Sequence, residues 1–131
     1  MSDTARISAG LRELALLTER VAAHPDGLDA IVAAMRRCLA EGGTLFFAGN
    51  GGSAADAQHL AAEYVVKYHA TQRKALRALA LTTDTSILTA SANDLGADAL
   101  FARQLEALAR PGDVLVLHLS LIHISEPTRP Y

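Results

Sequence analysis

A short apolar run that leads directly into a glycine-rich turn constrains this fold more than any other part of the sequence. Residues 44–48 (TLFFA) are followed by Gly49, Gly51 and Gly52, three glycines in four positions, before a helical pattern begins. A continuously apolar run is typical of a strand buried on both faces, and such strands belong to parallel sheets. Glycines allow positive φ angles and a close approach of the backbone to a ligand. The sequence therefore predicts a strand, a turn and a helix, with a ligand near the turn.

The helix after the turn has polar residues at informative positions. Ser53 is predicted to be its N-cap, with Asp56 three residues on as a capping-box-like partner, and the helix is expected to run to about Tyr68. The N-terminus of such a helix suits an anionic or polyhydroxylated ligand. His59 and Glu63 are four residues apart and therefore share one helix face. A glycine turn followed by this pair indicates a functional site.

The remaining pattern alternates strands with helices after two N-terminal helices. That order predicts an α/β fold with a parallel sheet and right-handed crossovers, whose ligands bind at the carboxyl ends of the strands. Residues 49–53 and 83–84, and whatever follows Leu117, would lie at that edge. The expected helices are 4–23, 28–40, 53–68, 86–92 and 97–109, with Leu100, Phe101, Leu105 and Leu108 of the last facing inward, and the expected buried strands are 44–48, 78–82 and 114–117.

Composition excludes several classes of protein. The chain has 131 residues, which suits one domain, and a net charge of −2, which gives no reason to expect a nucleic-acid or membrane partner. No apolar run is long enough to span a membrane. The single cysteine, Cys38, lies on an apolar helical stripe and is expected to pack in the core of a protein in a reducing, cytoplasmic compartment.

The last thirteen residues do not fit this pattern. Residues 119–131 follow the third strand without a glycine turn or a helix, and they resemble a translated sequencing adapter. An open α/β sheet usually has about five strands, whereas this sequence supplies three. We expect native sequence over residues 1–118, forming the N-terminal part of a single domain, and a non-native tail over 119–131.

Residues 1–118 resemble the sugar isomerase (SIS) domain family, and within it the phosphoheptose isomerases. The glycine turn and the His-x-x-x-Glu pattern are each weak alone, but they are fairly specific in combination. The matching segments are AGNGGS at 48–53, DAQHLAAE at 56–63, NDLG at 93–96 and PGDVL at 111–115.

The resemblance implies a five-stranded flavodoxin-like sheet and a homotetramer. It also implies a sugar phosphate substrate, with sedoheptulose 7-phosphate and D-glycero-D-manno-heptose 7-phosphate interconverted by enediol proton transfer. Glu63 matches the catalytic glutamate and, together with His59, the zinc ligands. The positions matching substrate contacts are Asn50, Gly51, Gly52, Ser53, Glu63, Asn93 and Asp94. The family's serine-rich phosphate loop, and the glutamine and histidine that complete its site, are absent from this sequence, so the 131-residue chain is expected to be inactive.

Other interpretations stay open at this point. From spacing alone, Glu63 would more often be a solvated surface residue and His59 an ordinary half-buried histidine. Asn93 and Asp94 fit a helix-ending turn equally well. A non-catalytic SIS protein that binds the bacterial replication initiator, or a sugar-phosphate-sensing regulatory domain, would share the fold. The glutamate favours the enzyme. His24, His69 and His118 have no partner at useful spacing and are interpreted as surface or packing residues.

Overall fold

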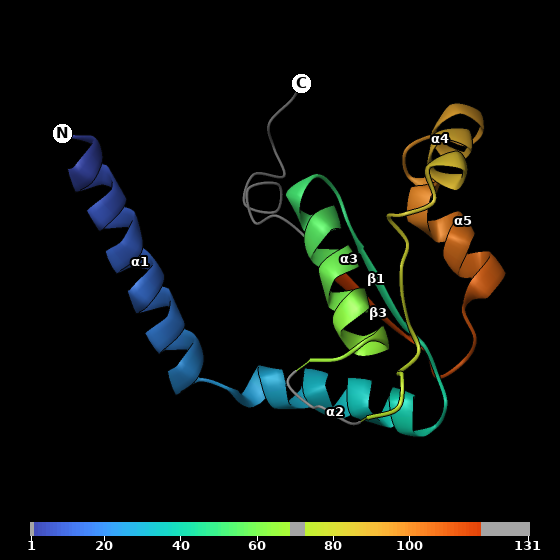
Figure 1. The fold of residues 1–131 in the computed structure, drawn as a ribbon, viewed down its shortest axis with the longest axis horizontal. Helices are drawn as coiled ribbons and strands as arrows, with labels where there is room; N and C mark the ends of the chain where they lie inside the picture. The colour runs from blue at the N-terminus through green and yellow to red at the C-terminus, as the bar shows by residue number, and fades with distance from the viewer. Residues whose placement is uncertain (1, 69–72, 119–131) are drawn as a thin grey trace. The chain divides into compact units, whose positions relative to one another are not determined.

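The computed structural model describes residues 2–68 and 73–118. The expected tail at 119–131 and His69 lie outside these residues. Five helices and three strands follow one another in the described part, in the order α1-α2-β1-α3-β2-α4-α5-β3 (Figure 1). The chain divides into two compact units, Met1–Ala34 and Met35–Tyr131, which are described separately below. No helix in the described ranges is both long and apolar enough to cross a membrane.

The first unit contains α1 (Asp3–Ala23) and the beginning of α2 (Asp26–Ala40). The Ser2 hydroxyl caps α1 by accepting a hydrogen bond from the Ala5 N–H at 3.3 Å. Pro25 separates the two helices, since proline disfavours a helical conformation in the residue before it. The predicted amphipathic pattern of α1 is present, and its apolar residues are exposed by 47–63%: Ile7, Leu11, Leu14, Leu17 and Val21.

The second unit is built on a three-stranded parallel sheet, which confirms the expected α/β class. Its strands are β1 (Leu45–Gly49), β2 (Ala78–Ala80) and β3 (Val114–His118), in the order β2-β1-β3. Phe46 pairs with Leu79 on one side and Leu115 on the other, and Gly49 pairs with His118. Every residue of the central strand β1 is buried, as its apolar sequence predicts.

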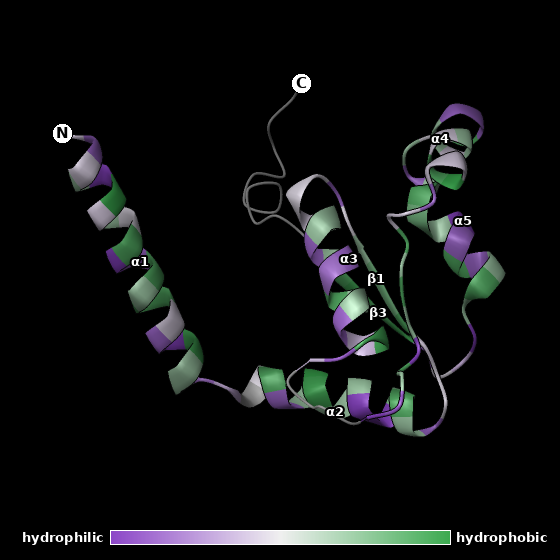
Figure 2. Ribbon diagram, in the orientation of Figure 1, coloured by the Kyte–Doolittle hydropathy of each residue, from purple (hydrophilic) through white to green (hydrophobic). Residues whose placement is uncertain are grey.

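Helix α3 (Gly52–Val65) packs on one face of the sheet and contacts all three strands. Its inner residues Ala57 and Ala61 are buried, and their small side chains let the helix lie close over Leu45 and Phe47. Cys38 of α2 is buried in the same cluster, which confirms its expected packing role. Figure 2 shows the green of apolar residues along β1 beneath α3.

The opposite face of the sheet is covered by α5 (Ala99–Leu108), which also packs against α4 (Thr85–Asp94). Phe101 and Leu105 contact a buried cluster of Phe46, Ala48 and Leu81. Two expectations for this region are wrong. Leu108 was expected to face inward, but it is the last residue of α5 and is 48% exposed. The helix was expected to reach Ala109, but it ends one residue earlier.

The outer strands also differ from the prediction of full burial. Leu79 of β2 and Leu115 and Leu117 of β3 are 38–50% exposed. These residues lie on the face covered by α5, which packs on Phe46 and Ala48 of the central strand and on Leu81 just after β2, and leaves these three side chains partly exposed. An apolar run alone does not reveal whether a strand is central or marginal, so the sequence predicted burial for all three strands alike.

Candidate active site on helix α3

The glycine turn positions α3 in a different way from the one predicted. Gly51, with φ at +56°, is the N-cap, and the helix begins at Gly52. Ser53 is therefore inside the first turn, where its N–H donates to the Asn50 carbonyl at 3.0 Å, and the predicted cap with Asp56 is wrong. The left-handed conformation of glycine replaced the expected serine cap. The helix also ends at Val65, three residues before the expected end.

Gly49 is required by close packing at the carboxyl edge of the sheet. A Cβ atom there would lie 2.8 Å from the Ser53 carbonyl oxygen and 2.9 Å from that of His118. Gly51 and Gly52, in contrast, face open space on the side where a Cβ would project. The turn is therefore tight toward β3 and open on its outer side, which leaves room for a ligand beside the first turn of α3.

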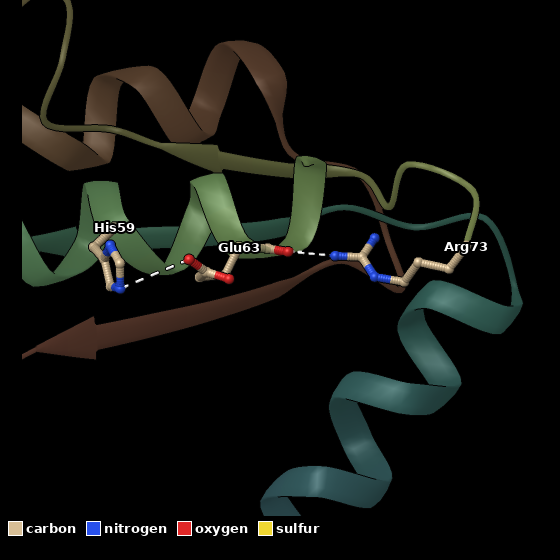
Figure 3. Close-up of polar contacts among 3 residues, drawn as sticks. All are labelled: His59, Glu63 and Arg73. Carbon is tan, nitrogen blue, oxygen red and sulfur yellow. Dashed lines mark hydrogen bonds and ion pairs between the residues drawn. The ribbon is translucent and has the colours of Figure 1, made fainter. Parts of the chain in front are cut away.

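Further along α3, His59 and Glu63 face one another, as their spacing predicts. Their Nε2 and Oε1 atoms are 3.8 Å apart (Figure 3). The histidine side chain is 74% exposed, whereas the glutamate side chain is only 27% exposed. A carboxylate that is partly withdrawn from water, with an accessible imidazole beside it, has the components of a proton-transfer or metal-binding site.

The pair lines a cavity of about 430 Å³. Two aromatic residues, Tyr64 and Tyr68, lie along its wall, and the Tyr64 ring is 5.7 Å from the ring of Phe47 in the core. Arg73 reaches this cavity from the segment before β2. The complete lining is His59, Leu60, Glu63, Tyr64, Tyr68, Arg73 and Leu76.

The other predicted site residues lie elsewhere. Asn50–Ser53 lie at the opposite end of α3, because ten residues of helix separate Ser53 from Glu63 by about 15 Å. Asn93 and Asp94 are exposed at the end of α4, where the Asn93 amide donates to the Asp94 carboxylate at 2.7 Å. The structure thus brings His59 and Glu63 together. Within the described residues, the turn at 50–53 and the Asn93–Asp94 pair do not line the cavity that His59 and Glu63 line.

Two polar residues near α3 were missed by sequence reasoning. Arg73 hydrogen-bonds backbone carbonyls at the end of α3. The amide of Gln58 donates to the carbonyl and hydroxyl oxygens of Thr82 at 3.3 and 3.2 Å, joining α3 to the end of β2. The preference of helix C-termini for basic side chains favours an arginine at this position, but no local spacing shows that Arg73 returns to the end of α3.

The His59–Glu63 pair also fits part of a zinc site. Two ligands of one tetrahedral zinc lie about 3.4 Å apart, given bonds of about 2.1 Å, and the observed separation is close to this value. No group of three or more His, Cys, Asp or Glu side chains is suitably placed within residues 2–68 and 73–118. The described residues therefore supply two candidate ligands, which is fewer than a zinc ion requires.

The fold and this helix define an α/β domain with a glycine turn at the carboxyl edge of a parallel sheet and a histidine–glutamate pair on the helix that follows. A family model for the SIS domain matches residues 11–120. The chain belongs to the SIS domain family.

The chain is similar in sequence to several phosphoheptose isomerases. That of Paramagnetospirillum magneticum is 53% identical over 111 residues, covering 76% of this chain and 57% of the relative. That of Desulfovibrio desulfuricans is 63% identical over 79 residues, covering 60% of this chain and 37% of the relative. The chain spans about half the length of the curated relatives it matches.

The chain is also similar to solved structures of phosphoheptose isomerases. The phosphoheptose isomerase of Neisseria gonorrhoeae matches with a TM-score of 0.78 and 40% identity, covering 88% of this chain and 60% of that one. The enzyme of Francisella tularensis matches with a TM-score of 0.83 and 30% identity, covering 89% and 61%. The parallel sheet with its flanking helices is therefore the fold of this family.

Proposed function

We propose that this chain supplies the first part of the active site of an isomerase that interconverts sedoheptulose 7-phosphate and D-glycero-D-manno-heptose 7-phosphate. The observation that carries the proposal is the half-buried Glu63 carboxylate, which lines a cavity beside His59 in a chain whose relatives are named phosphoheptose isomerases.

The proposed reaction requires one base at two adjacent carbons. Glu63 takes a proton from C1 of the ketose while the C2 carbonyl oxygen gains a proton, which gives an enediol. Return of the proton to C2, with loss of the O1 proton, forms the aldehyde. No electrons leave the sugar. The partial burial of the carboxylate keeps water from competing for the transferred proton.

The two ends of α3 suit opposite ends of the substrate. The separation of about 15 Å along the helix is shortened because side chains lean toward the helix N-terminus, and the remainder is roughly the length of an extended sugar phosphate. We assign Asn50, Gly51, Gly52 and Ser53 to contacts with the sugar, and Asn93 and Asp94 to the same role. The open space beside Gly51 and Gly52 supports this assignment.

Zinc is proposed as the cofactor, with His59 and Glu63 as two of its ligands. When bound there, zinc would supply Lewis-acid polarisation of the sugar oxygens. The 3.8 Å separation of the two ligand atoms supports this role, and the remaining ligands would come from outside the described residues.

A homo-oligomer, specifically a tetramer in the cytoplasm, is proposed for the working enzyme. The exposed apolar face of α1 supports self-association, because five large apolar side chains on one helix face would be stabilised by burial against another copy. The buried, free thiol of Cys38 suits a reducing compartment.

The two alternative functions have less support. A protein that binds the replication initiator, or a sugar-phosphate sensor, does not require a base, and the relatives described above are named as isomerases. We therefore retain the enzyme as the conclusion.

The test is isomerisation of sedoheptulose 7-phosphate by the full-length protein that contains this chain. Turnover by the wild type, with loss of at least about 10³-fold in Glu63→Gln, is expected for removal of the base. Glu106→Gln is the matched control, since this glutamate is exposed on α5 and pairs with Arg103 on the same helix. Activity retained in Glu63→Gln would remove Glu63 from the mechanism, and an inactive wild type would refute the proposed reaction.

A further inference from the structure

Helix α3 ends immediately after the candidate base, at a point where its backbone needs external partners. The last four carbonyls of any helix have no hydrogen-bond donor within the helix. The Ala62 carbonyl accepts from the Val66 N–H at 2.8 Å, and the Tyr64 carbonyl accepts from the Leu76 N–H at 3.2 Å. Within residues 2–68 and 73–118, no backbone N–H donates to the carbonyl of Glu63 itself.

Arg73 supplies the missing donor. One terminal nitrogen of its guanidinium donates to the Glu63 carbonyl (Figure 3). The other donates to the Tyr64 carbonyl at 2.6 Å. The second nitrogen also donates to the Lys74 carbonyl at 3.1 Å. A planar guanidinium is suited to such a pair of adjacent acceptors, and its positive charge is favourable at the negative end of the helix dipole.

These contacts fix the backbone of Glu63 from one side while its side chain projects from the other. Figure 3 shows the carboxylate directed toward His59 and the carbonyl directed toward Arg73. Arg73 is half-buried and comes from the segment that leads into β2, so it joins the end of α3 to the start of a strand. Movement of this helix end would displace the carboxylate from the cavity it lines.

We propose that Arg73 is a positioning residue that holds the Glu63 carboxylate in its reactive place by binding the backbone at the end of α3. This inference rests on the proposed isomerase function. In this arrangement three of the five guanidinium N–H groups donate to carbonyl oxygens, so most of its hydrogen-bonding capacity is directed at the backbone. Its loss should therefore lower kcat, whereas KM should change little.

The experiment compares steady-state kinetics of the full-length protein with those of Arg73→Ala and Arg73→Lys. A misplacement of about 1 Å is sufficient for a loss of about 100-fold, so kcat of Arg73→Ala is expected to fall about 10- to 100-fold, with KM within about threefold of wild type. Arg73→Lys should lie between the two, since an ammonium retains the charge but cannot bind both carbonyls in parallel. Millimolar guanidinium chloride should partly restore kcat of Arg73→Ala.

Arg77→Ala is the matched control. Arg77 is an exposed arginine four residues further on, and its Nε donates to the Thr44 hydroxyl at 3.1 Å, away from α3. It should keep wild-type kcat and show no response to guanidinium.

The proposal is overturned if kcat of Arg73→Ala is unchanged, whether or not its KM rises. It is also overturned if Arg77→Ala loses as much kcat as Arg73→Ala. If Arg73→Ala does not fold, a wild-type kcat in Arg73→Lys overturns it as well. An inactive wild-type protein would refute the isomerase function together with this inference, and so is distinguished from failure of Arg73 alone.

Discussion

The Asp113 carboxylate accepts a hydrogen bond from the backbone N–H of Thr44 at 2.7 Å, across 69 residues of sequence. Its second oxygen accepts from the Arg110 N–H at 2.8 Å. One side chain therefore joins the turn before β3 to the residue that precedes β1, at the sheet edge opposite the glycine turn. The hydrogen bond from Thr44, followed by the one from Arg110, holds the pKa of Asp113 below its usual value.

Replacing this carboxylate should destabilise the fold in a pH-dependent way. We expect Asp113→Asn to lower the free energy of unfolding by about 1 to 2 kcal/mol at pH 7, because the Arg110 bond and the charge are lost. A lowered pKa in the folded state means that the stabilisation is complete above the unfolded pKa of Asp and disappears as pH falls through the folded value. Urea unfolding from pH 7 down to pH 2 measures this.

Asp98→Asn is the control for that measurement. The Asp98 carboxylate is at the start of α5 and makes no capping hydrogen bond. Its replacement should change stability by less than about 0.5 kcal/mol. A pH-independent difference between wild type and Asp113→Asn would contradict the role given to the carboxylate.

The close packing at Gly49 predicts a clear cost for a single methyl group. In Gly49→Ala the new atom would meet two backbone oxygens within 3 Å, and neither can rotate away. We expect a loss of about 1 to 3 kcal/mol, read from the midpoint of urea unfolding. Gly27→Ala, in a helix and facing open space, should be neutral or slightly stabilising. Equal stability of the two variants would show that the turn relaxes freely.

Gln104 offers a test of a buried hydrogen bond. This side chain is 6% exposed, and its amide donates to the carbonyls of Leu81 and Leu100, both at 2.9 Å. Gln104→Leu preserves most of the volume but leaves the Leu81 carbonyl without this donor, so a loss of about 1 to 3 kcal/mol is expected in thermal or urea unfolding. The exposed Gln58 is the comparison, and Gln58→Leu should lower the free energy of unfolding clearly less. A larger loss in Gln58→Leu than in Gln104→Leu would contradict the role given to the buried hydrogen bond.

The zinc proposal predicts a change in metal content that does not depend on activity. Full-length protein prepared with zinc should hold about one ion per subunit, and His59→Ala should hold less than about half of that, since one ligand is removed. Elemental analysis after gel filtration measures it. His24→Ala is the control, because this histidine is at the end of α1, outside the candidate site. Equal zinc in wild type and His59→Ala would exclude His59 as a ligand.

The apolar face of α1 predicts a change in oligomeric state. Leu14→Glu introduces a charge into the stripe of Ile7, Leu11, Leu17 and Val21, and should dissociate the proposed tetramer, as measured by light scattering. Leu16 is equally exposed, at 57% against 56%, but lies on the opposite side of the helix. Leu16→Glu should therefore leave the assembly intact. An unchanged mass for Leu14→Glu would show that α1 does not mediate association.

Some features that depend on neighbouring residues in the chain were predicted correctly from the sequence. The apolar run before Gly49 indicated the buried central strand, and the four-residue spacing of His59 and Glu63 placed them on one helix face. The predicted start of α3 was wrong, because Gly51 with its positive φ is the N-cap and Ser53 is not. The partial exposure of Leu115 depends on strand order, and the contact of Arg73 with Glu63 depends on how the chain returns to α3. Neither is encoded in a local pattern.

The central position of β1 has a consequence for how the chain is made. Both neighbouring strands follow β1 in the sequence and are therefore synthesised after it. Asp113, which precedes β3 and bonds Thr44 beside β1, is synthesised 69 residues after Thr44. At about 5 to 20 residues per second, the ribosome needs roughly 3 to 14 s to supply that distance. During this time an apolar segment has an open edge on at least one side. Folding of this domain should therefore be limited by the rate at which β1 finds these distant partners.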